Sequence, residues 1–291
     1  RADFSAMKEP VLVSSIDGVG TKLKLAIQLG KHEAVAQDLV NHCVNDIAVT
    51  GARPLFFLDY IGAQRLEPAV FNQLIRGFTK ACRASGCALI GGETAQMPDL
   101  YSYGEYDLAG CIVGVVDRAR MLDGSRIVPA DVLVGLPSNG LHTNGYSLAR
   151  KVLLEKMNLN LQAKPEGHSK PLGEELLRIH RNYQPVLASL PAGMVKGAAH
   201  ITGGGLMDNL PRVLPSSCDA LIDTTAWKVP PVFRLIQKGG DIDPEEMFQV
   251  FNMGIGMVLV VSKRHQDEAV ALTKGKVIGR ITPGSGRVLL N

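Results

Sequence analysis

The residues best suited to chemistry form one short loop, Asp-Gly-Val-Gly-Thr-Lys from Asp17 to Lys22, which follows the apolar run 10–16. Glycines let backbone N–H groups approach phosphate oxygens closely, an ammonium neutralises phosphate charge, and a carboxylate can hold a hard cation. The spacing is neither that of a P-loop nor that of a dinucleotide-binding fold. The loop therefore predicts a magnesium-bound polyphosphate, with a purely steric turn between strand and helix as the alternative.

Three further carboxylates follow apolar segments and are candidate partners of a cation. Asp46 lies near the C-terminal end of a predicted helix, where the helix dipole disfavours an acid unless a partner compensates it. Glu93 follows a short strand and two glycines that let another group come close, and Asp59 follows the apolar run 55–58. Exposed, solvated side chains are the alternative for each. Magnesium is held by carboxylates together with substrate phosphates, so these residues predict such a site.

Two polar, glycine-rich turns in the second half predict contacts with an anion or substrate. Residues 138–145, Ser-Asn-Gly-Leu-His-Thr-Asn-Gly, join a strand to a helix and place polar groups at its N-terminus, where Thr143 or Asn144 could also act only as a cap. His142 suits proton transfer or phosphate contact near neutrality, with a solvent-facing loop histidine as the alternative. Residues 200–205, His-Ile-Thr-Gly-Gly-Gly, form a second turn, whose alternative is a tight loop without a ligand.

Composition narrows the function classes. A length of 291 residues predicts about two domains, and no apolar run approaches the roughly 18 residues that a membrane span requires. The net charge of +3 comes from intermixed acids and bases, so no nucleic-acid-binding surface is expected. The five cysteines form no C-x-x-C pair, which predicts a reducing cytoplasm, and neither zinc spacing nor a nucleophile elbow is present. The chain begins at Arg1 without a signal peptide, and we expect further residues upstream in the complete protein.

Hydrophobic periodicity predicts strands and helices mixed in each half of the chain. A charged, turn-rich segment separates two predicted domains, residues 1–120 and 121–291. Residues 161–171, polar with two prolines, predict a surface loop. Apolar spacing and glycine stops predict helices over 33–50, 67–85, 144–157 and 173–190, and strands over 10–16, 55–60, 87–90, 108–116, 131–136 and, as the last, 257–261.

Several motifs follow one another along the chain: Asp17–Lys22, Asn45-Asp46-x4-Gly51-Ala52-x-Pro54, Phe57–Tyr60, Gly91-Gly-Glu-Thr-Ala95, Glu105–Gly110, Ser138–Gly145, His200–Gly205 and Asn209–Pro215. Taken in order, they closely resemble the phosphoribosylformylglycinamidine cyclo-ligase (aminoimidazole ribonucleotide synthetase) family, from about Glu9 to Val288. Two stretches depart from the family pattern. A Gly-rich segment is not visible ahead of Phe4, and the usual Pro-Thr-Arg-Ile-Tyr stretch appears as Arg178-Ile-His-Arg-Asn182.

The resemblance implies a two-domain α+β subunit whose N-terminal mixed sheet, with its helices, forms a dimer barrel, and whose C-terminal α+β domain completes the substrate cleft. It also implies the ATP- and Mg²⁺-dependent ring closure of formylglycinamidine ribonucleotide to 5-aminoimidazole ribonucleotide in purine biosynthesis. In that chemistry ATP phosphorylates the formyl amide oxygen, and an amidine-side nitrogen then attacks the activated carbon. The implied partners are a ribonucleotide substrate and a second copy of the chain, with no nucleic acid or membrane.

The family roles carry over to matching positions only. The residues that resemble magnesium ligands are Asp17, Asp46 and Glu93. The catalytic candidates are Lys22, His142 and His200. A general acid or base role for either histidine is our own hypothesis. Two alternatives stay open: a related ATP-dependent small-molecule kinase and a non-catalytic nucleotide-binding subunit. The implied ATP contacts are Asp17, Gly18, Gly20, Thr21, Lys22, Asp46, Asp59, Glu93 and Thr94, and the implied substrate contacts are Ser138, Asn139, His142, Asn144, Gly203, Gly204 and Gly205.

Overall fold

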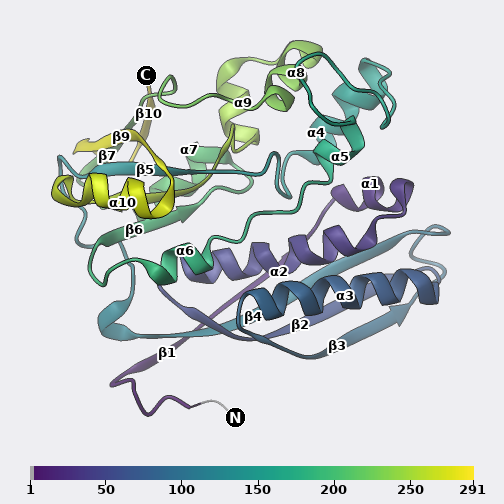
Figure 1. The fold of residues 1–291 in the computed structure, drawn as a ribbon, viewed down its shortest axis with the longest axis horizontal. Coiled ribbons are helices and arrows are strands. Elements are labelled where there is room, and N and C mark those ends of the chain that lie inside the picture. The colour runs from purple at the N-terminus through teal and green to yellow at the C-terminus, as the bar shows by residue number, and fades with distance from the viewer. Residues whose placement is uncertain (1–2) are drawn as a thin grey trace.

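Two β-sheets, one in each half of the chain, organise the computed structural model, which describes residues 3–291 (Figure 1). The first sheet has the strand order β1-β4-β2-β3, in which β1 and β2 are both antiparallel to β4 and β3 is parallel to β2. It is therefore a mixed sheet with β1 and β3 at its edges. Its strands are β1 (Pro10–Gly18), β2 (Arg53–Ala63), β3 (Ala88–Gln96) and β4 (Tyr106–Asp117).

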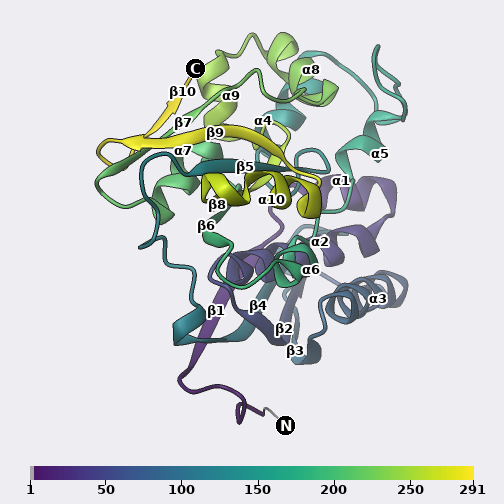
Figure 2. The same ribbon diagram turned by 60° about the vertical axis from the view of Figure 1, so that its left-hand side comes forward.

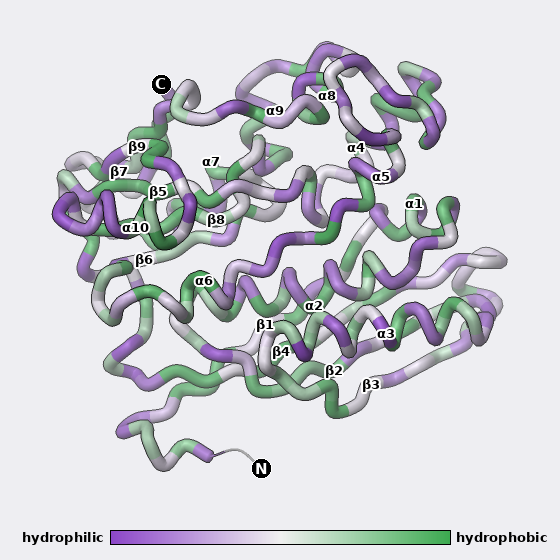
Figure 3. Tube along the Cα trace, in the orientation of Figure 1, coloured by the Kyte–Doolittle hydropathy of each residue, from purple (hydrophilic) through white to green (hydrophobic). Residues whose placement is uncertain are grey.

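Helices α1 (Lys22–Leu29), α2 (His32–Ala48) and α3 (Pro68–Ala84) accompany this sheet, and α2 lies between it and the second half of the molecule (Figures 1 and 2). This sandwiched position explains why α2 is buried on almost every side. Figure 3 shows hydrophobic and hydrophilic residues intermixed along α2. Its apolar residues, such as Leu39 and Ile47, face the sheet, while Asp38, Asn41 and Asn45 contact the second half.

The other face of the first sheet is not covered by any helix that the structure describes (Figure 1). Strand residues alternate between the two faces. In β1 the alternation leaves Leu12 64% and Ile16 73% exposed, while Val11 and Val13 pack toward the core. Two large apolar side chains of this edge strand therefore face solvent on the uncovered side of the sheet.

The second sheet has the order β10-β7-β9-β5-β8-β6, with a fully buried β8. Helix α4 (Tyr146–Arg150) continues directly into wider π turns, η2 (Lys151–Lys156). The strands are β5 (Val132–Pro137), β6 (Val195–His200), β7 (Cys218–Ile222), β8 (Ile255–Val261), β9 (Lys276–Pro283) and β10 (Val288–Leu290). The helices are α4 (Tyr146–Arg150), α5 (Leu172–Leu176), α6 (Gln184–Ser189), α7 (Gly205–Asn209), α8 (Pro231–Gly240), α9 (Pro244–Val250) and α10 (Gln266–Thr273), with short 3-10 turns η1 (Arg118–Arg120), η3 (Leu210–Val213) and η4 (Lys263–His265).

Most predicted elements are confirmed, but the helix predicted over 173–190 is wrong. The structure has two short helices there, α5 and α6, joined by the non-helical segment 177–183. The backbone of that segment is hydrogen-bonded to side chains of α2: Asp38 accepts from the His180 N–H at 2.6 Å, and Asn41 donates to the His180 carbonyl at 2.7 Å. Asn45 donates to the Arg181 carbonyl and accepts from the Tyr183 N–H, both at 2.8 Å. These tertiary bonds replace the helical ones.

The strand 257–261 is confirmed within β8, but β9 and β10 follow it, so it is not the last strand. The loop predicted over 161–171 is confirmed. The five cysteines are free thiols. Among residues 3–291, the helices are all too short or too polar to cross a membrane.

Candidate active-site cleft

A cleft of ≈ 460 Å³ lies where the two halves of the molecule meet. Its floor is acidic and imidazole-rich, because β1 supplies Asp17, α2 supplies His42 and Asp46, and the end of β6 supplies His200. Its rim has a cationic side chain, Arg212, from η3. The remaining lining includes Ser14, Ser15, Asp123, Thr202 and Asn209.

Local geometry explains why the acidic floor forms. Ser15 and Asp17 are two residues apart on β1, so both side chains point toward α2. His42 and Asp46 are one helical turn apart on α2 and share a face. His42 Nε2 is 2.7 Å from Asp17 Oδ2 and 3.7 Å from Asp46 Oδ2, and Ser15 Oγ donates to Asp46 Oδ2 at 3.0 Å.

The second half of the chain completes the floor through His200, whose Nδ1 is 2.8 Å from Asp46 Oδ1. Burial alone would raise the pKa of Asp46, but the hydrogen bond and charge of His200 outweigh it and the pKa is lowered. For Asp17, burial is likewise outweighed by the hydrogen bond and charge of His42, so its pKa is also lowered. Both acids are therefore ionised at neutral pH and suited to a hard cation.

Glu93 does not join Asp17 and Asp46 within this chain, so the prediction that these three carboxylates form one magnesium site is wrong for Glu93. The sheet register pairs Asp17 and Asp59 with the same β4 residue, Gly110, which places both acids on the helix-covered face. Glu93 pairs with Tyr60, the next residue along β2, so its exposed side chain lies on the opposite face.

Asp59 lies two strands from Asp17, about 10 Å away at the usual strand spacing, too far to share one ion. Burial raises the pKa of Asp59. Thr94 lies on the exposed edge strand β3, and its N–H donates to the carboxylate of Glu93 at 2.7 Å. A cation at the cleft floor would therefore be held by the two carboxylates Asp17 and Asp46, a number that fits magnesium bound with substrate phosphates.

Lys22 does not face the cleft, so the prediction of a direct triphosphate contact is not met. Its side chain is fully buried, and Nζ lies 2.7 Å from Asp38 Oδ2. It also donates to the carbonyls of His142 at 2.9 Å and Arg178 at 2.7 Å. With its three N–H groups directed to these partners, Lys22 joins α1, α2 and the second half instead. In the adjacent loop Thr21 Oγ1 lies 3.0 Å from Ser147 Oγ, and Gly20 adopts φ 67°.

The two glycine-rich turns of the second half lie next to each other. Asn144 Oδ1 is 3.2 Å from the position that a Cβ on Gly203 would take. Gly205 has φ 58° and its Cβ position lies 1.9 Å from the Phe248 carbonyl oxygen, so only glycine fits there. Gly204 also has positive φ, 89°. These turns put backbone N–H groups and an amide at one edge of the interdomain region.

The turn around His142 is internally hydrogen-bonded. Asn139 N–H donates to His142 Nε2 at 3.0 Å, and His142 itself adopts φ 63°. Ser138 Oγ donates to the Gly140 carbonyl at 3.0 Å. Asn139 is exposed, whereas His142 is buried and therefore not the solvent-facing histidine considered as the alternative. No side chain caps α4, so capping does not explain Thr143 or Asn144.

Sequence reasoning missed His42, His180, Asp123 and Arg212. The spacing of His42 and Asp46, one helical turn apart, was a usable signal for a paired site. Arg212 lies in the motif Asn209–Pro215, which pointed to the family but not to the cleft. His180 gave no signal, because only the tertiary fold brings it to the other histidines.

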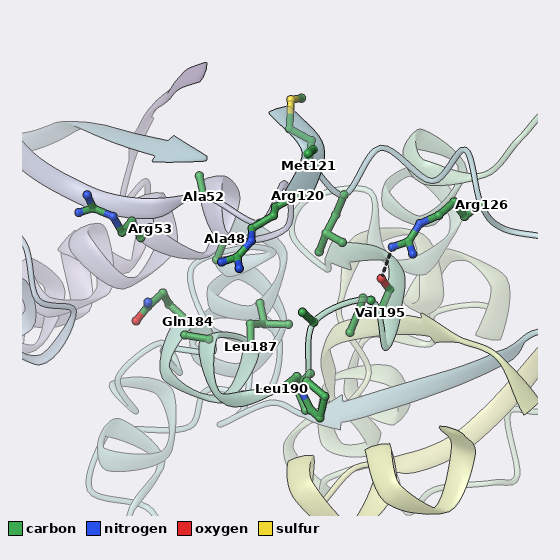
Figure 4. Close-up of a pocket in the computed structure, with 17 residues that line it drawn as sticks. Ala48, Ala52, Arg53, Arg120, Met121, Arg126, Gln184, Leu187, Leu190 and Val195 are labelled. Carbon is green, nitrogen blue, oxygen red and sulfur yellow. Dashed lines mark hydrogen bonds between the residues drawn. The ribbon is translucent and has the colours of Figure 1, made fainter. Parts of the chain in front are cut away.

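A second cavity of ≈ 440 Å³ lies at the linker between the two halves (Figure 4). Its lining is largely apolar, with Leu187 and Leu190 on one side and Met121 on another. Arg53, Arg120 and Arg126 also line it, and Arg126 donates to the Val195 carbonyl at 2.9 Å. Of the predicted site residues, Asp17, Asp46 and His200 line the first cleft, and none lines this cavity.

Comparison with known proteins places these features in a family. Residues 3–116 match the family described as AIR synthase related protein, N-terminal domain, and residues 128–290 match AIR synthase related protein, C-terminal domain. A phosphoribosylformylglycinamidine cyclo-ligase from Syntrophus aciditrophicus is 49% identical over 98% of this chain and 84% of its own length. That from Bacillus cereus is 48% identical over 97% of this chain and 83% of its own length. The chain belongs to the phosphoribosylformylglycinamidine cyclo-ligase family.

Solved structures of lower identity share the fold. The hydrogenase maturation protein HypE of E. coli matches with a TM-score of 0.71 at 17% identity, over 100% of this chain and 85% of that chain. A thiamine monophosphate kinase from Aquifex aeolicus matches with a TM-score of 0.68 at 16% identity, over 97% of this chain and 87% of that chain. The expected two-domain α+β architecture of the family is therefore confirmed.

Proposed function

We propose that this chain catalyses the ATP-dependent cyclisation of formylglycinamidine ribonucleotide to 5-aminoimidazole ribonucleotide, with ADP and phosphate as the other products. The observation that carries the proposal is the acidic floor of the cleft, where Asp17 and Asp46 from one half meet His200 from the other. The near-full-length similarity to cyclo-ligases supports the same reaction and disfavours the kinase and the non-catalytic subunit.

Asp17 and Asp46 would hold Mg²⁺ together with the phosphates of ATP. When bound, the ion would neutralise charge on the transferring phosphoryl group and align it. The chain's own contribution is to keep both acids ionised through His42 and His200. The loop Gly18–Thr21 would offer backbone N–H groups to the phosphates, because its glycines permit close approach.

The ribonucleotide would bind across the neighbouring turns of the second half, with its phosphate near Gly203–Gly205 and polar contacts from Asn139 and Asn144. Arg212 on the rim of the cleft supplies positive charge for the same anion. His200 lies at the junction of the two binding regions and is our candidate for moving a proton during ring closure. His142 is buried behind the turn and is proposed to position it.

A homodimer is part of this proposal. The uncovered face of the first sheet, with Leu12, Ile16 and Ile90 at 64%, 73% and 58% exposure, is the surface we assign to it. A second copy packed there would bury a face that water otherwise contacts. A location in the cytoplasm fits the free thiols and the purine-biosynthetic reaction.

The test is release of ADP from ATP and Mg²⁺ with and without formylglycinamidine ribonucleotide. We expect release to depend on the ribonucleotide, and Asp46→Asn to lose most of it. Glu93→Gln is the matched control, because Glu93 lies on the opposite face of the sheet from Asp17. ADP release that is independent of the ribonucleotide, or an Asp46→Asn protein with normal turnover, would contradict the proposal.

A further inference from the structure

Two of the five cysteines lie together at the end of helix α3, outside the site described above. Cys82 is in the last turn of the helix, and Cys87 directly precedes β3. Cys82 is 1% exposed, whereas Cys87 is half-buried, so solvent reaches the pair through Cys87. Neither residue lines the cleft or the second cavity. The reaction proposed for the cleft therefore makes no use of these two thiols.

The way in which α3 ends explains why the two side chains meet. The Cys87 N–H donates to the Cys82 carbonyl at 3.0 Å, and the Gly86 N–H donates to the Arg83 carbonyl at 3.2 Å. These two bonds make a Schellman motif, in which side chains at the positions of Cys82 and Cys87 frequently contact each other. The motif needs a left-handed residue between them, and Gly86 supplies it with φ 66°. The backbone therefore brings one thiol to the other.

The separation of the two residues suits a disulfide bond, which requires Cα atoms about 4.4–6.8 Å apart. Standard backbone lengths put the Cα atoms of two residues joined by a 3.0 Å N–H···O=C bond at most about 7 Å apart, and closer when the bond is bent. The Cys82 thiol also donates a hydrogen bond to the Cys87 sulfur. The two sulfur atoms are therefore already neighbours, and the bond can close by a short approach of the side chains.

The hydrogen bond between the thiols makes them chemically different. It raises the pKa of Cys82, with burial acting in the same direction, and it lowers the pKa of Cys87. The negative charge of Asp59 adds to the rise at Cys82. Thiolates, and not thiols, attack disulfides. Cys87, which is also the more accessible residue, is therefore the first to react, and Cys82 is the thiol that follows.

Cys111 on β4 offers a comparison from the same domain. It has the same intermediate exposure as Cys87. The preceding residue, Gly110, faces Leu39 of α2, so Cys111 points to the uncovered face of the sheet. Cys82 belongs to the core between the sheet and its helices. The sheet therefore separates Cys111 from Cys82, and Cys111 is the matched control for Cys87.

We propose that Cys82 and Cys87 form a thiol-oxidation site, which closes to an intramolecular disulfide by reaction with a low-molecular-weight disulfide such as oxidised glutathione. The Cys87 thiolate attacks one sulfur of that disulfide, which forms a mixed disulfide and releases the first thiol. Cys82 then loses its proton and attacks the Cys87 sulfur, which releases the second thiol. The two cysteines are oxidised, the small disulfide is reduced to two thiols, and the protons of the cysteines end on those thiols. Excess small thiol reverses the reaction through the accessible Cys87.

The experiment incubates the reduced, folded chain with mixtures of oxidised and reduced glutathione, alkylates the remaining thiols in denaturant, and measures the mass of the protein and of its tryptic peptides. Trypsin cuts after Lys80 and Arg83, which separates the two cysteines. With oxidised glutathione in excess, we expect two alkyl groups fewer per chain, and peptide 81–83 joined to the peptide that begins at Ala84. With reduced glutathione in excess, all five thiols should be alkylated again.

Single substitutions identify the partners and the order of attack. Cys82→Ser should stop at the mixed disulfide and keep one glutathione per chain, because the second thiol is missing. Cys87→Ser should neither close the bond nor bind glutathione at Cys82. The peptide that begins at Ala84 also contains Cys111, so Cys111→Ser must still give the joined peptides. Thermal unfolding checks that each variant is folded, and the peptide map of the unaltered chain decides where a variant is not.

The other outcomes overturn the proposal. If all five thiols are still alkylated after exposure to oxidised glutathione alone, the pair is not a thiol-oxidation site. Joined peptides that disappear in Cys111→Ser would make Cys111 the partner of Cys82. A disulfide that links two chains instead of two residues of one chain would contradict the geometry at the end of α3. A Cys82→Ser protein that binds no glutathione would contradict the first attack by Cys87.

Discussion

Replacing Lys22 with methionine tests whether this lysine joins the two halves or contacts ATP. The substitution keeps the length of the side chain and removes the charge. It leaves Asp38, itself 0% exposed, as a buried carboxylate without its ion-pair partner. It also removes the donor to the carbonyls of His142 and Arg178. Burial lowers the pKa of Lys22 and raises that of Asp38, and their attraction opposes both shifts.

Removing one member of a buried ion pair typically costs about 3–5 kcal/mol. We expect Lys22→Met to lower the free energy of unfolding by that amount, measured by urea denaturation at one fixed protein concentration. Adding Asp38→Asn should recover part of the loss, because the amide oxygen can still accept from the His180 N–H. Lys24→Met is the control, since Lys24 is 45% exposed and surface pairs are worth about 0–1 kcal/mol.

The reasoning fails if Lys22→Met changes the free energy of unfolding no more than Lys24→Met does. A protein of normal stability whose affinity for ATP alone has fallen would show that Lys22 reaches the triphosphate after all. If the double variant Lys22→Met/Asp38→Asn loses as much free energy of unfolding as the two single variants together, Lys22 and Asp38 are not coupled.

Three further predictions concern the dimer, the metal and pH. Ile16→Asp puts a charge on the uncovered sheet face and should convert the dimer to monomer, as measured by analytical ultracentrifugation. Asn72→Asp, on the exposed side of α3, is the control and should leave the dimer intact. If the Ile16→Asp protein stays dimeric, that face is not the dimer interface. Asp46→Asn should raise the Mg²⁺ concentration that gives half of the maximal rate by about 10–100-fold or more. An unchanged Mg²⁺ dependence would argue against Asp46 as a ligand of the ion. Burial lowers the pKa of His32 from 6.5. The neutral form of His32 therefore contributes to the free energy of unfolding above pH 6.5, and this contribution is lost as the pH falls below that value. His32→Gln should reduce the pH dependence of the free energy of unfolding, measured by urea denaturation at several pH values. An unchanged pH dependence would mean that other groups cause it.

Sequence patterns predicted the elements that depend on local periodicity. Helix α3 has apolar residues at helical spacing, starts at a proline and is followed by Gly86, and it forms as predicted. The helix predicted over 173–190 had the same kind of pattern. It fails because α2 offers its backbone better partners than its own helix would. Tertiary hydrogen bonds of this kind have no signature in the segment that receives them.

Only part of the candidate site could be predicted, because some of its residues are visible in local motifs and others depend on the tertiary fold. Asp17 stands near the end of a strand and Asp46 near the end of a helix, where their chemistry is visible in the chain, and they meet at the cleft floor. The position of Glu93 depends on sheet register, in which a shift by one residue moves a side chain to the other face. Burial of Lys22 depends on the docking of the second half, which a local motif cannot encode.

The contacts between α2 and residues 177–183 have a consequence for how this protein can change over generations. The hydrogen bonds from Asp38, Asn41 and Asn45 to that segment all go to main-chain atoms. Every amino acid except proline offers the same main-chain groups, so these bonds place no demand on the side chains of the segment, and only packing holds its buried members such as His180 and Tyr183. The departure from the usual family stretch at 178–182 is what such freedom allows. Mutational tolerance should therefore be higher at exposed positions of the segment, such as Arg178, than at the three α2 residues.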